Sequence, residues 1–208
     1  MSVDYIIKQI DTVMGNKPLS SVEKGRHFLD WVLSYIFNKS DTEIEEYDLI
    51  DGVLKCDGAY DCGIDASFIE NDTLSIIQSK FSSSNSLEAV CGFLAQIQQI
   101  IINGLDKDAR EDLKAIYNSI LELDSIDIYY ITNDEIQIND WTTIITHVKE
   151  VGKAIKELYQ NKRVKIRILD INNIEDFIDE SRSVVPKKFQ GTRMNLVLEK
   201  YFENKEKN

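Results

Sequence analysis

The chain has 208 residues, of which 43% are hydrophobic and 29% charged, so it has the composition of a globular protein with one sizeable core. We see no long uncharged apolar run and no signal peptide, and three unevenly spaced cysteines suggest reduced thiols, so we expect a cytoplasmic protein without membrane partners. A net charge of −12 argues against a protein that holds nucleic acid mainly through its own Lys and Arg side chains.

Apolar residues at helical spacing, interrupted by turn-forming residues, predict helices along much of the chain. These helices are expected at residues 3–14, 20–37, 87–103, 107–123, 141–160, 174–181 and 195–203. Runs of β-branched and aromatic residues predict strands at residues 47–54, in the two arms of a hairpin around residues 71–72, and at residues 126–132 and 164–170. Residues 55–62 are expected to form a loop.

The strands come first as an antiparallel run and then alternate with helices. This order predicts an α/β fold with a mixed β-sheet of about five strands and helices on both faces. We expect a single domain over residues 1–208, with an N-terminal helix in 1–18, a core in 19–170 and a C-terminal helical extension in 171–208.

The predicted hairpin is the most informative segment. Asn71-Asp72 lies between its arms as a two-residue turn, and counting outward from this turn places Asp65 opposite Gln78. Directly opposed residues share a sheet face, with Cβ atoms ~4.5–5.5 Å apart. Lys80 lies two residues beyond Gln78 and is expected on the same face. The spacing therefore suggests a metal site, made by a carboxylate and an amide oxygen, with a lysine beside it.

Two simpler interpretations compete with a metal site. The polar residues could be solvated side chains of a surface hairpin, or Lys80 could form a structural salt bridge to Asp65. The strand that carries Gln78 and Lys80 is strongly apolar, which favours a central strand covered on both faces. Polar groups on such a strand need partners, because unpaired buried charges are costly. The expected burial of this strand therefore favours a functional site over solvated surface residues.

An Asp on the second strand and a Gln-x-Lys on the third strand resemble the restriction-endonuclease-like nucleases, the PD-(D/E)xK superfamily. In that superfamily an acidic residue and a following acidic-x-Lys share one end of a sheet. Asp65 matches the first carboxylate and Lys80 matches the lysine. Gln78 stands where Asp or Glu is commoner, although Gln recurs there in some branches. The resemblance implies the restriction-endonuclease-like version of the mixed α/β sheet.

The local sequence around these residues is similar to the N-terminal nuclease region of the AIPR (abortive infection phage resistance) proteins. Those proteins commonly show a Gly-rich acidic loop, a Gly-Ile-Asp and a strand ending in Gln-Ser-Lys-aromatic. The overlap runs from about residue 51 to residue 81, with weaker agreement to about residue 132. Cys62 stands where Gly is frequent. Because family members are usually much longer, this chain could be the N-terminal part of a longer protein. The matching segments are Asp57-Gly58, Asp61-Cys62-Gly63-Ile64-Asp65-Ala66 and Leu74-Ser75-Ile76-Ile77-Gln78-Ser79-Lys80-Phe81.

The resemblance implies metal-dependent hydrolysis of phosphodiester bonds, with Mg²⁺ as the cofactor and Mn²⁺ as a substitute. Asp65, the Gln78 amide oxygen and the Ser79 backbone carbonyl are the candidate metal ligands, since Mg²⁺ prefers oxygen donors. Lys80 would orient or deprotonate the attacking water. Glu23, on the helix before the sheet, is a candidate second acid for catalysis and metal binding. It has a rival structural role, because Ser20 followed by Glu23 matches a capping box.

The expected function is therefore an endonuclease that acts on nucleic acid, with DNA favoured over RNA, in antiphage defence. A homodimer or an attached sensor domain would be compatible partners. The alternative is a catalytically inactive nuclease-fold module that serves as a scaffold or as a nucleic-acid-binding part. Three further acids, Asp51, Asp57 and Asp61, could hold a second ion or shape the loop, and solvated turn acids are the simpler interpretation of each.

Overall fold

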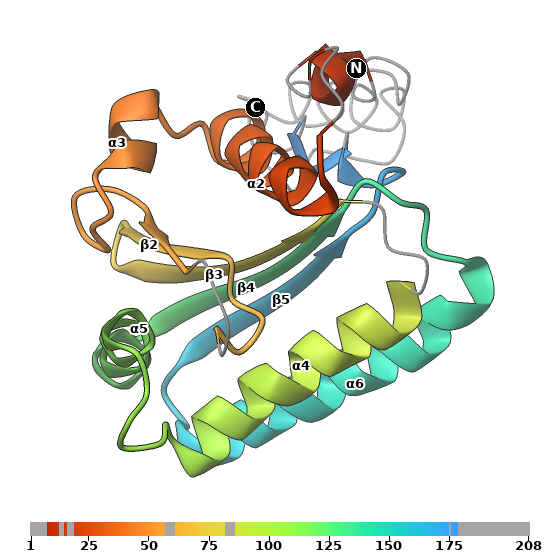
Figure 1. Ribbon diagram of the computed structural model, residues 1–208. Helices are drawn as coiled ribbons and strands as arrows, with labels where there is room; N and C mark the ends of the chain where they lie inside the picture. The colour runs from red at the N-terminus through yellow and green to blue at the C-terminus, as the bar shows by residue number, and fades with distance from the viewer. Residues whose placement is uncertain are drawn as a thin grey trace, which may run out of the picture.

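A mixed sheet forms the centre of the protein in the computed structural model, which describes residues 8–12, 15, 19–56, 61–81, 86–174 and 176–178. Five strands are hydrogen-bonded in the order β1-β2-β3-β4-β5, with antiparallel pairing from β1 to β3 and parallel pairing from β3 to β5 (Figure 1). This confirms the predicted fold class. The strands are β1 (Leu54–Lys55), β2 (Ala66–Glu70), β3 (Thr73–Lys80), β4 (Ser125–Thr132) and β5 (Arg163–Leu169).

Helices cover both faces of the sheet. In Figure 1, α2 (Ser21–Trp31) lies on one face, whereas α4 (Ser86–Asn103) and α6 (Ile138–Leu158) lie side by side on the other. The remaining helices are the π-helix η1 (Val32–Ile36) that continues α2, the short α3 (Asp41–Glu45) and α5 (Glu111–Glu122). Among the described residues, no helix combines the length and the apolar character needed to span a membrane.

The hairpin between β2 and β3 forms with the predicted register. Glu70 pairs with Thr73, and Ala66 pairs with Ile77 at the other end of the ladder. Both turn residues, Asn71 and Asp72, have positive φ angles of 50° and 56°. Two consecutive positive φ angles are typical of the type I′ turn, whose twist matches that of the flanking strands. The turn chemistry therefore sets the register that positions the candidate site.

Strand β3 is buried on both faces, which explains its nearly continuous apolar sequence. Leu74 and Ile76 belong to the larger apolar cluster, which includes residues of α4 and α6. Ile77 points the other way and joins Ala66 and Phe68 in a second cluster with the apolar face of α2. Alternate residues of one strand thus anchor both layers of helices. The strand that ends at Lys80 is held from both sides.

The predicted strand over residues 47–54 is wrong apart from its last residue. The Asp48 carboxylate accepts the backbone N–H groups of Ile50 and Asp51, at 2.8 and 2.9 Å, and so folds this segment into a turn. Tyr47 has a positive φ angle of 53°, which is incompatible with a strand. The side-chain-to-backbone bonds of an Asx turn compete successfully with strand pairing here. Only Leu54–Lys55 pairs with β2, so Lys55 is not in the expected loop.

The other boundaries follow the sequence closely. The capping box forms, and α2 with η1 extends to Ile36, one residue short of the expected end. Helix α5 begins at Glu111 rather than near residue 107, because residues 107–108 form a turn. Residues 8–12 are helical within the expected first helix, and residues 174 and 176–178 are helical within the expected 174–181 helix. The expected helix at 195–203, and the loop residues Asp57 and Gly58, lie outside the described residues.

A tight turn over residues 61–64 brings the chain into β2. The Asp61 carboxylate accepts the Gly63 N–H at 2.8 Å, and the Asp61 carbonyl accepts the Ile64 N–H at 3.0 Å. Gly63 has a φ angle of +73°, and a Cβ atom there would lie 2.6 Å from Oε1 of Gln96 and 2.9 Å from Nε2 of Gln78. Both its conformation and its packing therefore require glycine.

We predict that Gly63→Ala lowers the free energy of unfolding by at least about 1–2 kcal/mol, the cost of a left-handed L-residue, with the steric clash added. Urea unfolding measures this effect. Gly92→Ala in α4 is the matched control, because a Cβ atom there meets no heavy atom within 4 Å. The control should be neutral or slightly stabilising, since Ala favours helices more than Gly. Equal effects of the two substitutions would contradict the packing described here.

Candidate active site

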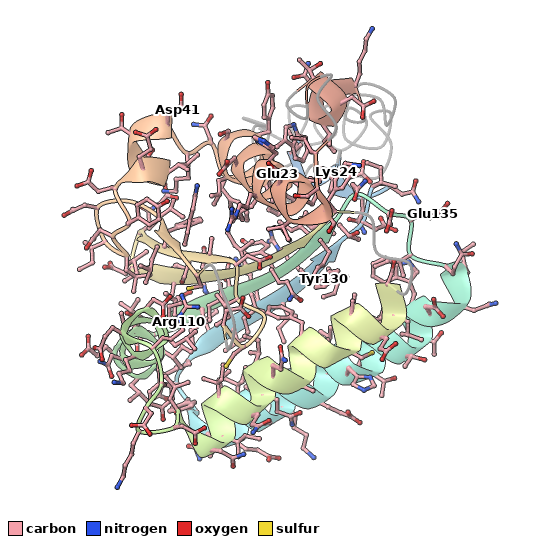
Figure 2. The ribbon with its side chains drawn as sticks, in the orientation of Figure 1. Glu23, Lys24, Asp41, Arg110, Tyr130 and Glu135 are labelled. Atoms are coloured by element: carbon pink, nitrogen blue, oxygen red, sulfur yellow. The ribbon has the colours of Figure 1, made fainter. Side chains whose placement is uncertain are left out.

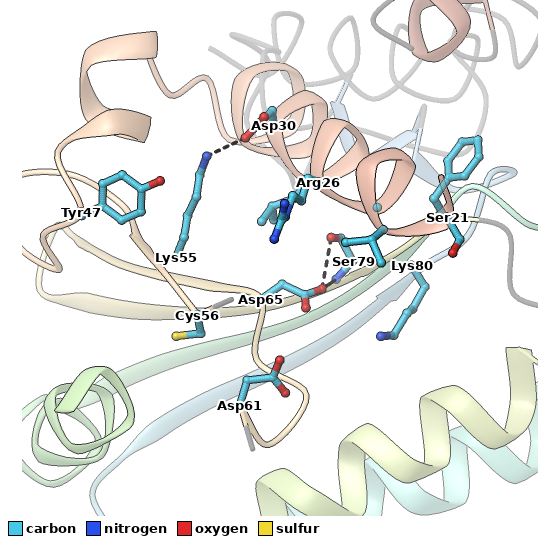
Figure 3. A pocket seen from close by; sticks show the side chains of 14 residues that line it. Ser21, Arg26, Asp30, Tyr47, Lys55, Cys56, Asp61, Asp65, Ser79 and Lys80 are labelled. Carbon is cyan, nitrogen blue, oxygen red and sulfur yellow. Dashed lines mark hydrogen bonds and ion pairs between the residues drawn. The ribbon is translucent and has the colours of Figure 1, made fainter. Parts of the chain in front are cut away.

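A pocket of about 590 Å³ opens between α2 and the ends of β2 and β3 (Figure 3). Its walls come from α2, from the segment before β1, from the turn at residues 61–64 and from the last residues of β3. The pocket therefore collects side chains that are far apart in the sequence but meet at one end of the hairpin. Its lining residues are Ser21, Val22, Gly25, Arg26, Leu29, Asp30, Tyr47, Lys55, Cys56, Asp61, Asp65, Ser79, Lys80 and Phe81.

Asp65 lies at the point where the pairing of β2 with β3 stops. Its N–H donates to the carbonyl of Ile77 at 2.9 Å, and its carbonyl accepts the N–H of Cys56, also at 2.9 Å. The carboxylate Oδ2 accepts the backbone N–H of Ser79 at 2.7 Å and the Ser79 hydroxyl at 3.2 Å. The backbone of Asp65 is thus held from both sides, and its carboxylate has a fixed orientation toward β3.

The pocket changes the acidity of Asp65. Burial disfavours the charged form and raises the pKa of this carboxyl from 3.8 to about 6. The hydrogen bond from the Ser79 N–H and the positive charge of Lys80 act in the opposite direction, and the negative charge of Asp61 adds to the rise. A partly desolvated carboxylate with a raised pKa, inside a pocket, is a common property of functional sites.

Lys80 lines the same pocket as Asp65. Figure 3 shows both side chains at the Ser79 end of the pocket, with the Lys80 amino group directed away from the strand. Of the ion pairs formed within the described residues, none joins Lys80 to Asp65. The alternative of a direct structural salt bridge between them is therefore not observed. The lysine is close enough to lower the pKa of Asp65 but is not consumed by pairing with it.

Gln78 does not join Asp65 and Lys80 in the pocket. Gln78 lies on the same side of the sheet as Ile76, the side that faces α4, and it is 5% exposed there. It is not among the residues that line the pocket. Its amide lies against the turn, near Gly63. The prediction that Gln78 shares one spot with Asp65 is corrected here. Asp65 lies just outside the regular ladder. Its carboxylate therefore points toward Ser79, and not to the sheet face on which strand alternation would place it.

A small polar layer lies beneath the sheet at this position. The Gln78 Oε1 and the hydroxyl of Tyr130, which pairs with Gln78 across β3 and β4, are both buried, and neither has a hydrogen-bond partner among the residues that the structure describes. Figure 2 places Tyr130 between the sheet and α4. Most buried polar atoms in proteins have a hydrogen-bond partner, so such a pair is unusual. The sequence indicated Gln78 but offered no signal for its neighbour Tyr130.

Glu23 has the structural role that its spacing from Ser20 suggested. Its carboxylate accepts the Ser20 N–H at 2.8 Å and the Ser20 hydroxyl at 2.7 Å, and it does not line the pocket. These two hydrogen bonds lower the pKa of Glu23. The carboxylate is therefore held at the N-terminus of α2 (Figure 2), and the geometry supports the cap in preference to a metal ligand.

The structure adds charged residues that the sequence did not single out as site residues. Arg26 and Asp30 lie four residues apart on α2 and line the pocket, and Lys55 forms an ion pair with Asp30 at 2.7 Å. Asp61, for which a solvated turn was the simpler interpretation, is half-buried and also lines the pocket. The i, i+4 spacing on α2 was the available signal for the first two, since such residues share a helix face.

The donor set is compatible with a hard divalent cation. Mg²⁺ usually keeps several waters and needs only one or two carboxylates, which Asp65 and Asp61 can supply. The Ile77 carbonyl points toward the β2 side of β3, where it accepts the Asp65 N–H, and the carbonyl two residues on, that of Ser79, faces the same side of the strand. Within the described residues, no three His, Cys, Asp or Glu side chains gather as a metal cluster.

Comparisons with known proteins do not identify a relative: no family model, no curated protein and no solved structure matches this chain.

We predict that Asp65→Asn stabilises the metal-free protein at pH 8. The folded-state pKa of about 6 exceeds the ordinary 3.8, so the folded protein holds this proton more tightly and loses stability as the pH rises through this interval. The gap corresponds to at most about 3 kcal/mol, reduced by solvent screening in an open pocket. Asn can still accept the Ser79 N–H.

Urea unfolding in EDTA at pH 8 and at pH 4 measures this difference, with the exposed Asp124→Asn as control. The stabilisation by Asp65→Asn should shrink at the lower pH, whereas the control should change little. A variant that is less stable than wild type at pH 8 would show that burial does not disfavour the Asp65 carboxylate.

Proposed function

We propose that this protein is a metal-dependent endonuclease that hydrolyses phosphodiester bonds in DNA. One observation carries the proposal: Asp65, which directly precedes β2, and Lys80, the last residue of β3, line one pocket together with Ser79. The predicted carboxylate and lysine thus meet where a phosphate can approach them. The resemblance of the surrounding sequence to the AIPR nuclease region supports this chemistry and suggests a role in antiphage defence.

Each pocket residue has a defined task in this proposal. Asp65 and Asp61 hold the cation, with the Ser79 carbonyl as a further oxygen ligand. A bound Mg²⁺ would supply charge neutralisation on the phosphate and a more acidic water. Lys80 binds a phosphate oxygen and orients the attacking water, which requires an amino group that is not paired with Asp65. The Ser79 N–H and hydroxyl keep Asp65 in position.

The alternative function is a nuclease-fold module without activity that serves as a scaffold or nucleic-acid-binding part. Two observations favour it. Gln78 occupies the place of a second strand carboxylate and lies outside the pocket, so the charge of the site is low. The net charge of −12 also disfavours strong binding of a polyanion. The enclosed carboxylate and unpaired lysine favour the active enzyme, because a scaffold has no need of them.

Cleavage of supercoiled plasmid in Mg²⁺, Mn²⁺ or EDTA tests the proposal. The wild type should cleave with either metal and not in EDTA, and Asp65→Asn and Lys80→Ala should each reduce the rate by roughly 100-fold or more. Glu23→Gln should retain activity, since Gln also completes a capping box. At a metal concentration below saturation, the rate should rise between pH 5 and pH 7, because Asp65 must ionise to bind the cation and its metal-free pKa is about 6.

Asp124→Asn and Lys149→Ala, at exposed positions outside the pocket, are the matched controls. Cleavage that survives substitution of both Asp65 and Lys80 would reject the assigned site. A wild type that is inactive with every metal on plasmid, single-stranded DNA and RNA would favour the inactive module.

A further inference from the structure

Tyr47 stands exposed at the pocket wall without a structural reason in the fold. Its side chain is 62% exposed, and among the described residues it forms no hydrogen bond and no aromatic contact. Its φ angle of 53° is a conformation that aromatic residues rarely adopt. The Asx turn at Asp48, whose carboxylate accepts the N–H groups of Ile50 and Asp51, follows Tyr47 directly. A bulky apolar ring is thus kept in solvent at a conformational cost.

The ring and the proposed catalytic residues lie at different ends of one pocket. Figure 3 shows Tyr47 on the far side from Lys80, with Lys55 and Arg26 between them and Asp65 nearer the lysine. All of these residues line the same pocket of about 590 Å³. That volume is in the range of small-molecule sites. The pocket therefore has a polar, charged end for a phosphate and an aromatic surface at the other end.

We infer that Tyr47 is a stacking platform for an unpaired nucleobase, which makes single-stranded nucleic acid the substrate class of this site. Every nucleobase has a π-face, and stacking on an exposed aromatic ring holds a strand without reading its sequence. Arg26, between the two ends, would contact the sugar-phosphate backbone. The inference rests on the proposed function for the placement of the scissile phosphate beside Asp65.

A duplex does not offer this contact, because its bases are already stacked on each other. Only a single strand, or a nucleotide displaced from a duplex, presents a free base face. The net charge of −12 weakens the general attraction of any polyanion, whether single-stranded or duplex. Such a protein gains more from a contact with a base, because stacking on an aromatic ring does not depend on neutralising a phosphate charge.

Fluorescence anisotropy with a labelled single-stranded oligothymidine in EDTA tests the inference without cleavage. Tyr47→Asn removes the ring but suits the positive φ angle, since Asn is enriched in that conformation. Tyr47→Phe keeps the ring. Tyr47→Asn should weaken binding by roughly 5- to 150-fold, the range measured when a stacking aromatic is removed, and Tyr47→Phe should bind like the wild type. Ile50→Ala is the control, because Ile50 is 72% exposed nearby but does not line the pocket.

Competition experiments show whether the stacked base comes from a single strand, a duplex or a free nucleotide. An unlabelled oligothymidine that competes at lower concentration than a duplex of equal length supports a single-strand site. Thymidine monophosphate that competes as well as the oligomer would show that the pocket takes a free nucleotide and would overturn the single-strand assignment. Equal binding by wild type and Tyr47→Asn, or equal losses in Tyr47→Asn and Tyr47→Phe, would overturn the stacking role.

The binding assay needs neither metal nor hydrolysis, so its outcome is separate from that of the cleavage assay. Tyr47-dependent binding in a protein that never cleaves would retain the stacking platform and reject the nuclease. Metal-dependent cleavage that is unaffected by Tyr47→Asn, on single-stranded and duplex substrates alike, would retain the nuclease and reject the platform.

Discussion

The hydrogen bonds between the Asp65 carboxylate and Ser79 are the interaction on which the candidate site depends. They form where the β2–β3 ladder ends. There the Asp65 carboxylate accepts the hydrogen bond from the Ser79 N–H, in the place of a backbone carbonyl of a neighbouring strand. This arrangement places a charge in a partly desolvated position, and burial raises the pKa of the carboxyl to about 6. In the proposed nuclease, a bound cation would offset the free energy lost by holding that charge. The same bonds orient the carboxylate before any ligand arrives.

The two faces of β3 explain why the site can be rigid. Ile77 contributes to the apolar cluster beneath α2, and Leu74 and Ile76 contribute to the cluster beneath α4 and α6. A strand packed on both faces cannot shift without disturbing both layers, because protein interiors are close-packed. Ser79 and Lys80 follow directly from this anchored segment. The backbone of Ser79 and Lys80 is therefore held in place, and movement in the site is restricted to side chains and ligands.

The hairpin was predictable because its turn chemistry and its alternation agree. Asn71-Asp72 specifies a two-residue turn, and the count outward from it gave the observed register. The segment at residues 47–54 was mispredicted because the Asp48 carboxylate competes locally for the N–H groups that a strand would use. The pattern of apolar residues gives no sign that a side chain will compete for these backbone N–H groups.

The site was only partly predictable for a related reason. Simple alternation places Asp65 and Gln78 on one face, but that rule applies only within the regular ladder, which ends at Ala66. The backbone of Asp65 departs from the regular pattern, and its side chain separates from that of Gln78. Tyr47 was missed because only the tertiary fold brings its segment to the pocket, and Arg26 had no signal beyond its i, i+4 spacing to Asp30.

A direct test of the account is the titration of the Asp65 carboxyl carbon by NMR, with Asp65→Asn used to assign the resonance. Without divalent metal, the midpoint should lie near pH 6, and saturating Mg²⁺ should move it to lower pH, since cation and proton compete for one carboxylate. A midpoint at or below the ordinary value of 3.8, or a midpoint that Mg²⁺ leaves unchanged, would contradict the claim that this pocket holds a desolvated carboxylate ready for a cation.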